Sequence, residues 1–496
     1  MKHKKENIFR RPLLRILVAM ILFGAAGLAY KIQSETDISY AMEKVPATCT
    51  DSGYTLYTNE NTGSTDVADV VAPLGHDYGE WAVIREAEGA NPAVEERICS
   101  RCEARENRAK HENVGIAQLY LNGDFTGIGK KNEVNLTAEF SSEDISFTAF
   151  ATAKHQGHST LAFDKKNYTV KLFTDTDRSE KMKMTLSHWN PENKYILKAN
   201  YQDSSQSRNL VSADIWADMT ASRAGLAEEM KTLSNFGAVD GFPVALYLNY
   251  DFSGLYTMNL HKDDDLFGMK DSEDHAVVIV NHTDGDEAFF RSDAAFTEDS
   301  PWEIEYCGTE DDAWVRERLN DLLDFVQTAD DQTFREQIGT YLDVESAVDY
   351  LIAMYSLGLQ EHGAKDLILV TYGQDKPWIC SMYDMEEAFD TEGPDPVCDK
   401  GKWDSGTGSL LWDRILNLYY DEICNRYAQL RQDVLAPEQL TQRLEQYVQS
   451  IPWNLYEADA KVYDTEIFTP EKLQQMLADL WLLIEQADKL FTYKGV

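Results

Sequence analysis

Acidic residues stand at both ends of one short apolar segment. LILVTY (367–372) is rich in apolar and β-branched residues, GQDKP (373–377) is a turn cluster, and WICSMY (378–383) resumes the strand pattern. A hairpin of this kind brings its outer ends together. The acidic residues at those ends are Glu361, Asp366, Asp384 and Glu386. Gathered carboxylates repel each other unless a cation lies among them, and Mg²⁺ suits all-oxygen sites in which phosphate is often a further ligand.

The spacing of these residues fits phosphoryl transfer. Protein kinases place an Asn metal ligand five residues after the catalytic Asp, and a second metal-binding Asp after a short hairpin. Glu361 and Asp366 have this separation, and Asp384 follows the hairpin. A solvated acidic loop is the alternative interpretation, because the whole chain is acidic.

A second segment could contact phosphate. In TAKHQGHSTLAFDKKNYTVKLF (152–173), a strand pattern leads into a turn that contains Gln156, Gly157 and Ser159, and the strand NYTVKLF carries Lys171. In a kinase-like β-rich lobe, a turn between two strands covers the phosphates and a strand lysine reaches them. The alternative is that Lys171 faces solvent.

The elements that must position these residues change in type along the chain. Residues 115–128, with Asn122-Gly123 at the turn, and residues 244–258 are both typical of hairpins. After Asp203, apolar residues at helical spacing predict a helix, with an ion pair between Asp203 and Arg208 at its start. Helices are also predicted within 311–358 and at 410–433, 437–449 and 470–492.

Composition limits the class of protein. The chain has 496 residues and a formal net charge of −39. That charge argues against a nucleic-acid partner, because phosphate backbones require clustered Lys and Arg. The high content of Trp, Tyr and Phe predicts large cores, and seven cysteines in this length do not make a disulfide scaffold.

The N-terminus has the pattern of an export signal. Basic residues precede an apolar run from Leu13 to Tyr30. This arrangement keeps the N-terminus in the cytoplasm and sends the following chain across the membrane. Residues 1–31 are therefore predicted to be a signal peptide, cleaved near Gly27-Leu28-Ala29, or a single membrane anchor. The protein is expected at the cell membrane or outside the cell.

Residues 32–112 are predicted to be a small β-rich module. PATCTDSGYTLYTNENTG (46–63), GHDYGEW (75–81) and RICSRCEAR (97–105) together resemble an eroded copy of a Cys-rich repeat of bacterial surface proteins. Structural zinc takes four ligands, and the four residues that could supply them are Cys49, His76, Cys99 and Cys102. Their order and spacing match no standard zinc ribbon. A disulfide between Cys99 and Cys102, or free thiols, is the alternative in an exported protein.

The remainder, 113–496, resembles the CotH (spore coat protein H) kinase-like family. The resemblance is carried in order by KHQGHSTLAFDKKNYTVKLF, KYILKANYQDSSQSRNLVSADIW, VDGFPVALYLNYDFSGLYT, LHKDDDLFGM, WEIEY and KDLILVTY…KPWICSMYDMEEAF. It implies an α+β, atypical bilobal protein-kinase-like fold, with a β-rich N-lobe and an α-rich C-lobe. It also implies the use of ATP with Mg²⁺ or Mn²⁺ to phosphorylate Ser or Thr of cell-surface or spore-coat proteins.

The resemblance also implies roles for single residues. Lys171 stands as the phosphate-anchoring lysine, Asp384 as the principal metal ligand, and Gln156, Gly157 and Ser159 as the phosphate-covering turn. Three positions depart from the family pattern: Glu361 replaces the catalytic Asp, Asp366 the metal-binding Asn, and Glu386 the second Asp of D-M-D. All three keep oxygen ligands, which favours retained metal binding with altered or slowed chemistry. His362 is either a surface residue or a hydrogen-bond partner of Glu361.

Two other functions remain open. A non-catalytic surface protein could use the same fold for binding, adhesion or coat assembly, and the substituted loop and the N-terminal repeat favour it. A glycosidase could use Glu361 and Asp384 as a carboxylate pair, but the lysine strand would then have no role.

Overall fold

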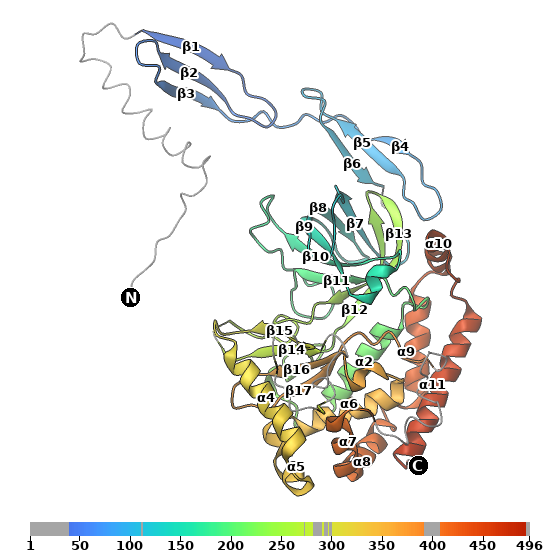
Figure 1. Cartoon of the computed structure of the whole chain (residues 1–496). Coiled ribbons are helices and arrows are strands. Elements are labelled where there is room, and N and C mark those ends of the chain that lie inside the picture. Colours follow the sequence, from blue (N-terminus) through green and yellow to red (C-terminus); the bar gives the residue numbers. More distant parts are fainter. Residues whose placement is uncertain are drawn as a thin grey trace. The chain divides into compact units, whose positions relative to one another are not determined.

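The computed structural model describes residues 39–110, 113–271, 273–280, 290–291, 296, 300–390 and 407–492. The chain divides into two compact units. The N-terminal unit is residues 1–88 with 92–111, and the C-terminal unit is residues 89–91 with 112–496. Sheets and helices are both present, which confirms the mixed α+β class (Figure 1).

Two antiparallel three-stranded sheets form the described part of the N-terminal unit. Their orders are β1-β2-β3 and β4-β5-β6. The strand bounds are β1 Tyr40–Val45, β2 Gly53–Asn59, β3 Thr65–Val71, β4 Ala82–Arg85, β5 Val94–Ile98 and β6 Arg105–Ala109. Most side chains of these strands are exposed or half-buried, so the sheets cover little apolar core.

Seven strands of the C-terminal unit close into a barrel, in the order β10-β11-β13-β12-β7-β8-β9. Their bounds are β7 Ala117–Gly123, β8 Val134–Ser141, β9 Ser146–Gln156, β10 Asn167–Phe173, β11 Lys194–Lys198, β12 Gly241–Leu248 and β13 Asp251–Leu260. Strand β12 pairs with two described neighbours. Its pairing with β7 is parallel, and its pairing with β13 is antiparallel. Closure leaves no sheet edge exposed, so the barrel is a firm support for the residues at its strand ends.

The two predicted hairpins have different outcomes. The hairpin at 244–258 is confirmed by β12 and β13, whose turn residues Asn249 and Tyr250 have φ of 51° and 66°. The turn predicted at Asn122-Gly123 is wrong, because both residues belong to β7 and β8 begins only at Val134. The Asn249 side chain bonds the Gly123 N–H and C=O at 2.8 and 3.1 Å, which keeps this end of β7 in the sheet.

A second sheet, in the order β15-β14-β16-β17, carries the predicted acidic hairpin. Its strands are β14 Ala276–Val280, β15 Trp302–Cys307, β16 Leu367–Thr371 and β17 Ile379–Met382. The antiparallel register pairs Leu367 with Met382, and the predicted hairpin is confirmed. Ile279 and Val370 of this sheet belong to the same buried core as Val170 and Leu246 of the barrel. One core therefore joins the barrel to the sheet.

The helices gather on the side of the C-terminal unit away from the barrel, with α10 as an exception close to β13 (Figure 1). The helix bounds are α2 Arg208–Ala221, α3 Glu228–Lys231, α4 Ala313–Thr328, α5 Asp331–Gln337, α6 Val344–Leu357, α7 Leu410–Leu418, α8 Tyr420–Leu430, α9 Pro437–Ser450, α10 Trp453–Tyr463 and α11 Pro470–Leu490. The predicted helix at 410–433 is two helices, α7 and α8, and α10 was not predicted.

Helix α6 lies at the centre of this group and delivers the chain to the acidic residues. Asp343 caps its start by accepting the Ser346 N–H at 2.7 Å. Gly358 ends it in a left-handed conformation with φ of 80°, which glycine adopts without strain. The chain then enters the short 3₁₀ turn Glu361–Gly363 and strand β16.

Among the described residues, no helix combines the length and apolar character that a membrane crossing requires. The leader or anchor predicted at 1–31 lies outside the described residues.

Candidate functional site

The β16–β17 hairpin brings two of the predicted carboxylates together. Asp366 immediately precedes β16, Asp384 follows β17, and the Tyr383 N–H donates to the Asp366 carbonyl at 3.4 Å. Asp366 and Asp384 have φ of 59° and 58°, in the left-handed region that residues with a side chain seldom adopt. Such backbone strain clusters at functional sites. These two positions are therefore candidates for function on geometry alone.

Asp384 is paired with Lys198, the last residue of β11. The Lys198 ammonium donates to Asp384 Oδ1, and its side chain is only 13 % exposed. Burial alone would raise the pKa of Asp384, but the ammonium groups of Lys198, Lys365 and Lys262 hold it below its usual value. Burial would lower the pKa of Lys198, but Asp384 and Glu386 raise it instead. Asp384 is therefore held as a carboxylate in a half-buried position.

Lys171, the predicted phosphate anchor, has a different partner. Its Nζ lies 3.2 Å from Glu133 Oε1, and both side chains are about one-third exposed. Lys171 stands opposite Thr152 of β9 and opposite Lys194, the first residue of β11, whereas Lys198 is the last residue of β11. The structure therefore joins Asp384 to Lys198 and does not join it to Lys171.

The other two carboxylates are crowded. Burial and the charge of Asp384 raise the pKa of Asp366 to about 8. Burial and the same charge raise the pKa of Glu386 to about 7. Both shifts have the same origin, since two like charges in a poorly solvated site disfavour ionisation. A cation placed among these groups would relieve that cost.

Glu361 lies at the edge of the site. Its side chain is exposed and forms an ion pair with Lys365, whose Nζ also lies 3.7 Å from Asp366 Oδ2. Burial would lower the pKa of Lys365, but Asp366 and Glu361 raise it. Lys365 therefore connects the predicted catalytic position with the predicted metal position, a link that sequence reasoning missed.

His362 differs from both expectations for it. It is buried, not on the surface, and its Nδ1 lies 3.3 Å from Glu387 Oε1 and not at Glu361. Its Nε2 lies 3.0 Å from the Tyr383 carbonyl, and Glu387 also accepts the Glu361 N–H at 2.9 Å. Burial would lower the pKa of His362, but Glu387 and Asp366 raise it. Glu387 and His362 thus fix the loop that carries Glu361, and Glu387 was missed.

A pocket opens beside the Lys198–Asp384 pair. Besides these two, the residues that line it include Gln156 at the end of β9, Asn259 on β13 and Lys262 just after β13. The side-chain oxygens Gln156 Oε1 and Asn259 Oδ1 are buried and accept no hydrogen bond. An unpaired buried acceptor costs free energy. A ligand that carries N–H or O–H groups would satisfy both acceptors.

The turn that was predicted to cover the phosphates lies only partly at the pocket. Gln156 lines the pocket, but Gly157 and Ser159 are not among its lining residues. Gly157 has φ of 106°, and a Cβ there would lie 2.0 Å from Thr160 Oγ1, so the turn requires glycine. Ser159 is exposed and begins the 3₁₀ turn Ser159–Ala162. The structure therefore brings one of the three predicted turn residues to the pocket.

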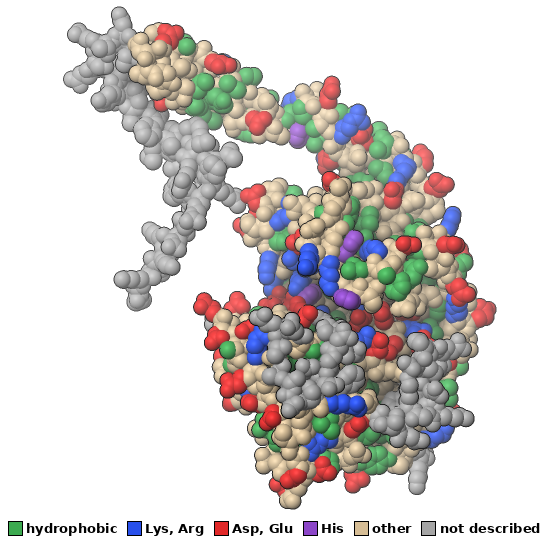
Figure 2. Space-filling view, in the orientation of Figure 1, with side chains coloured by type: hydrophobic (Ala, Val, Ile, Leu, Met, Phe, Trp, Pro, Cys, Tyr) green, Lys and Arg blue, Asp and Glu red, His purple; other side chains and the backbone are tan. Residues whose placement is uncertain are grey.

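A second lysine, Lys262, was not predicted from the sequence. Its ammonium lies 4.7 Å from the centre of the Tyr383 ring, and burial lowers the pKa of Lys262. Figure 2 shows Lys, Arg and His side chains gathered over strands β9–β11 of the barrel, with Asp and Glu side chains below them. This distribution puts positive charge on the barrel side and negative charge on the hairpin side of the pocket.

Arg208 secures the helix that follows β11. The predicted pair with Asp203 is confirmed at 3.7 Å, and Asp203 also accepts the Arg208 N–H at 2.9 Å. Arg208 further pairs with Asp390 at 3.0 Å, just beyond the acidic loop. The start of α2 is thus tied to the chain that follows Glu386 and Glu387.

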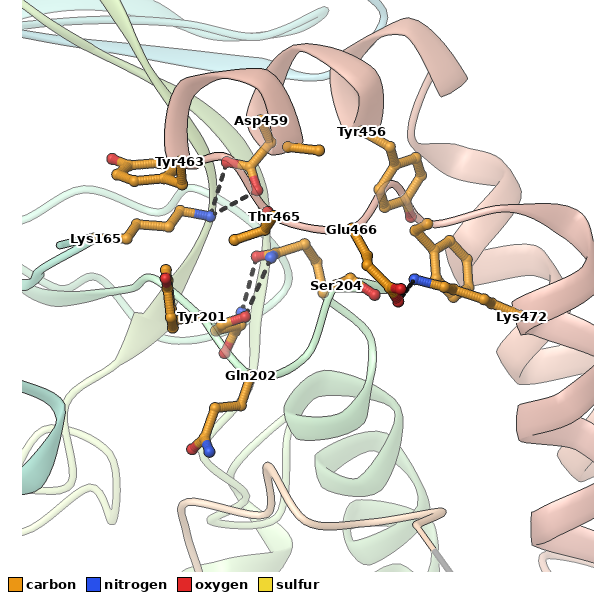
Figure 3. A pocket seen from close by; sticks show the side chains of 14 residues that line it. Lys165, Tyr201, Gln202, Ser204, Tyr456, Asp459, Tyr463, Thr465, Glu466 and Lys472 are labelled. Carbon is orange, nitrogen blue, oxygen red and sulfur yellow. Dashed lines mark hydrogen bonds and ion pairs between the residues drawn. The ribbon is translucent and has the colours of Figure 1, made fainter. Parts of the chain in front are cut away.

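A second cavity, shown in Figure 3, is lined by Lys165, Tyr201 and Tyr463 among others. The Lys165 ammonium points at Asp459 of α10, 2.8 Å away, and donates to the Leu255 carbonyl at 2.6 Å. Lys165 is 2 % exposed, so these contacts satisfy it. Lys165 therefore holds α10 against β13 and is not free to bind a ligand in this cavity.

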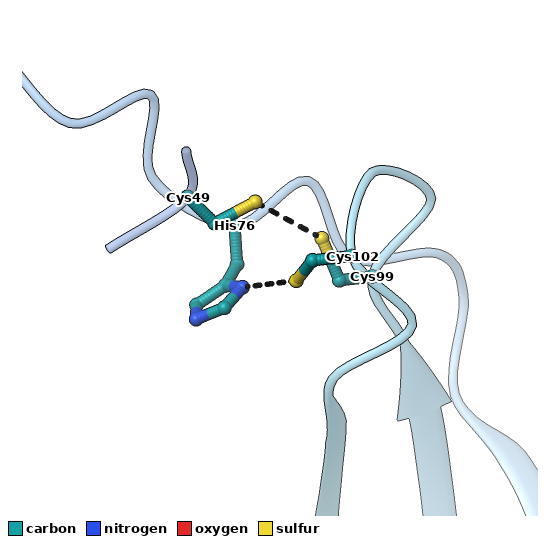
Figure 4. A group of neighbouring side chains, drawn as sticks. All are labelled: Cys49, His76, Cys99 and Cys102. Carbon is teal, nitrogen blue, oxygen red and sulfur yellow. Dashed lines mark hydrogen bonds between the residues drawn. The ribbon is translucent and has the colours of Figure 1, made fainter. Parts of the chain in front are cut away.

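The Cys49, His76, Cys99 and Cys102 side chains converge in the N-terminal unit (Figure 4). Their ligand atoms all lie within 4.8 Å of one another, which is the only such group of three or more His, Cys, Asp or Glu in the described ranges. The acidic residues near Asp384 do not converge as closely. They would suit Mg²⁺, which is usually held by one or two carboxylates together with substrate phosphates.

The sequence model described as "CotH kinase protein" matches residues 153–484. The chain therefore belongs to this family. It is the same family that the sequence resembles in the hairpin and in the strands that carry lysine. A comparison with curated proteins finds no match.

Proposed function

We propose that the protein is a protein kinase that transfers phosphate from ATP to Ser or Thr of exported proteins, through the pocket between β11 and the acidic hairpin. The observation that carries the proposal is the ion pair between Lys198 and Asp384 beside a pocket with two unsatisfied acceptors. Membership of the CotH kinase family supports the reaction class. The proposal includes a kinase-like, two-lobed arrangement in which the barrel and the helices are the lobes.

The residues that line the pocket offer the charges and the hydrogen-bond acceptors that a nucleotide would contact. Lys198 and Lys262 supply positive charge for phosphate oxygens, and Gln156 and Asn259 supply acceptors for the N–H or O–H groups of a base or ribose. Phosphoryl transfer needs mainly positioning and charge neutralisation. Lysines and acceptors held at strand ends of a closed barrel provide the positioning.

Asp384, Asp366 and Glu386 are the residues that would hold Mg²⁺ or Mn²⁺. The crowding that raises the pKa of Asp366 and Glu386 supports this assignment. When bound, the ion would neutralise phosphate charge. Glu361, at the exposed edge and steadied by Lys365, is proposed to orient the acceptor hydroxyl and take its proton.

The N-terminal basic and apolar residues support export, so the substrate is proposed to be a cell-surface or spore-coat protein. The net charge of −39 supports a protein partner over a nucleic acid. The membrane would be contacted through residues 1–31.

One observation favours a second function. Glu361, Asp366 and Glu386 depart from the family pattern, so a surface protein that binds nucleotide without transferring phosphate is the alternative. A glycosidase has less support, because Glu361 and Asp384 are each paired with a lysine.

The test is a transfer assay with ATP radiolabelled on its terminal phosphate and with Mg²⁺ or Mn²⁺. The purified full chain is compared with Asp384→Ala, and the matched control is Asp375→Ala, an exposed acidic residue in the turn of the same hairpin. We expect labelling of the chain or of a Ser- and Thr-rich acceptor protein. Asp384→Ala should reduce it by about 100-fold or more, as for loss of a charge-stabilising group in an active site.

Asp375→Ala should leave labelling unchanged. Equal labelling by wild type and Asp384→Ala would contradict the proposal. Nucleotide binding without any transfer would favour the binding protein.

A further inference from the structure

The Cys49 group is assembled from distant parts of the N-terminal unit. Cys49 lies between β1 and β2, His76 follows β3, and Cys99 and Cys102 lie between β5 and β6. Cys49 Sγ is 3.8 Å from Cys99 Sγ, and Cys102 Sγ is 3.2 Å from His76 Nδ1 (Figure 4). In tetrahedral zinc, Zn–S bonds of about 2.3 Å put two sulfurs about 3.8 Å apart. The group therefore has the dimensions of a four-coordinate zinc site.

The backbone around Cys99 is arranged to stabilise a thiolate. The Asp77 and Arg101 N–H groups both donate to Cys99 Sγ, at 3.3 and 3.4 Å. Hydrogen bonds to a charged ligand favour the charged form and orient it. The Arg101 guanidinium donates to the Leu74 and Gly75 carbonyls at 3.3 and 3.1 Å, so a positive charge ties the chain before His76 to the turn that carries the two cysteines.

The described part of the N-terminal unit has only a small apolar core. Its buried apolar residues in the described part are Cys49, Pro92, Ala93, Val94, Cys99 and Ala109. Two of these are members of the group, and the others are small. Met42, Val71, Leu74 and Ile84 are instead more than half exposed. Small domains without an adequate core are usually held by disulfides or a structural metal.

The group also lies where the two sheets meet. The Gly75 N–H donates to the Cys49 carbonyl at 3.1 Å, and the Ser100 N–H donates to the Asp77 carbonyl at 2.9 Å. These bonds join the loop before β2, the loop before β4 and the turn between β5 and β6. An ion at this point would crosslink all three segments.

We propose that Cys49, His76, Cys99 and Cys102 bind one Zn²⁺ as a structural site. All four positions are protein ligands, so no position remains for a substrate or water, and the site is not catalytic. Thiolate and imidazole ligands in a tetrahedral set are suited to zinc. Binding replaces the three thiol protons, which leave to solvent, and uses the neutral His76 imidazole through Nδ1.

Metal analysis of the full chain without an affinity tag tests the site. Wild type is expected to contain one zinc per chain after dialysis. Cys102→Ser, which changes the exposed one of the three cysteine ligands, should lose it, while Cys424→Ser, a cysteine of α8, should keep it. Cobalt(II) added to metal-free wild type should give the absorption of a tetrahedral cobalt–thiolate site, and Cys102→Ser should not give it.

Mass spectrometry distinguishes the zinc site from the alternative, a disulfide among these cysteines. Intact chain alkylated at purification should carry no internal disulfide, and a chelator should make Cys49 and Cys99, which are buried, reactive to alkylation. A chain without zinc whose mass shows a disulfide among Cys49, Cys99 and Cys102 would overturn the proposal. Zinc retained in full by Cys102→Ser would overturn it as well.

Discussion

At the scale of single residues, the main question is which lysine, Lys171 or Lys198, lies beside Asp384. Lys171 in YTVKLF and Lys198 in YILKA carry the same strand signal, so alternation of apolar residues does not distinguish them. Only the sheet register puts Lys198 at a strand end next to Asp384 and Lys171 beside Glu133. The carboxylates were easier to predict, because a hairpin of known length brings its own ends together.

Glu361 and Asp366 give a prediction at the same scale. Glu361→Asp shortens the acidic arm by one methylene, and Asp366→Asn keeps an oxygen ligand while removing a charge that the site disfavours. The double variant should transfer phosphate faster than wild type, by about 10- to 100-fold, since misplacement by about 1 Å costs on the order of 100-fold. The measurement is the initial rate of label transfer, with Asp375→Asn as control. No gain in rate would contradict the roles given to these two residues.

At the scale of elements, the local patterns predicted the hairpin at 367–382 and helices α2, α9 and α11. Helix α10 was missed; of its sequence WNLYEADAKVY, only Leu455, Tyr456 and Ala460 are buried. It is instead held to the barrel by polar contacts, above all by Lys165 and Asp459. Contacts of this kind join residues almost three hundred positions apart and leave no local signal.

The Lys165–Asp459 pair gives a prediction for the docking of α10. Asp459→Ala leaves a buried ammonium without its partner, and should lower the free energy of unfolding by about 3–5 kcal/mol. Lys165→Met combined with Asp459→Asn removes both charges and keeps an acceptor for the Leu255 N–H, so the double variant should lose less than the single one. Denaturant unfolding measures both. A single variant as stable as wild type would show that the pair does not hold α10.

Glu192, between β10 and β11, gives a pH-dependent prediction. Burial and the nearby Asp265 and Asp263 raise the pKa of Glu192 to about 10, far above its value in an unfolded chain. The folded state therefore keeps a proton that the unfolded state releases, and the free energy of unfolding falls as pH rises above about 4.5. Glu192→Gln needs no proton at this site, so it should be more stable than wild type by about 1–3 kcal/mol at pH 8 and equal to it at pH 4.

Thermal melting at the two pH values measures this difference. Glu143→Gln, which changes an exposed glutamate of the β8–β9 turn, is the control and should show no such dependence. A Glu192→Gln variant with the same melting temperature as wild type at pH 8 would show that Glu192 is ionised in the folded protein.

At the scale of the whole molecule, the pocket depends on long-range packing within the C-terminal unit. Its lysines come from β11 and the loop after β13, and its carboxylate, Asp384, comes from the loop after β17. Because the barrel and the four-stranded sheet share one core, these ends are held against each other. Barrel closure and this shared core could not be predicted from local patterns, which give strands but not their order.

The central claim is that a nucleotide binds between Lys198 and Asp384. The most direct test is ATP affinity, measured by titration calorimetry with Mg²⁺ on the full chain, for wild type, Lys198→Ala and Lys171→Ala, after melting temperatures have shown that all three are folded. Loss of a charge-assisted contact of about 1.5–3 kcal/mol predicts affinity reduced by about 10- to 100-fold in Lys198→Ala. Lys171→Ala should bind as wild type does. Unchanged affinity in Lys198→Ala, with loss in Lys171→Ala, would contradict the account.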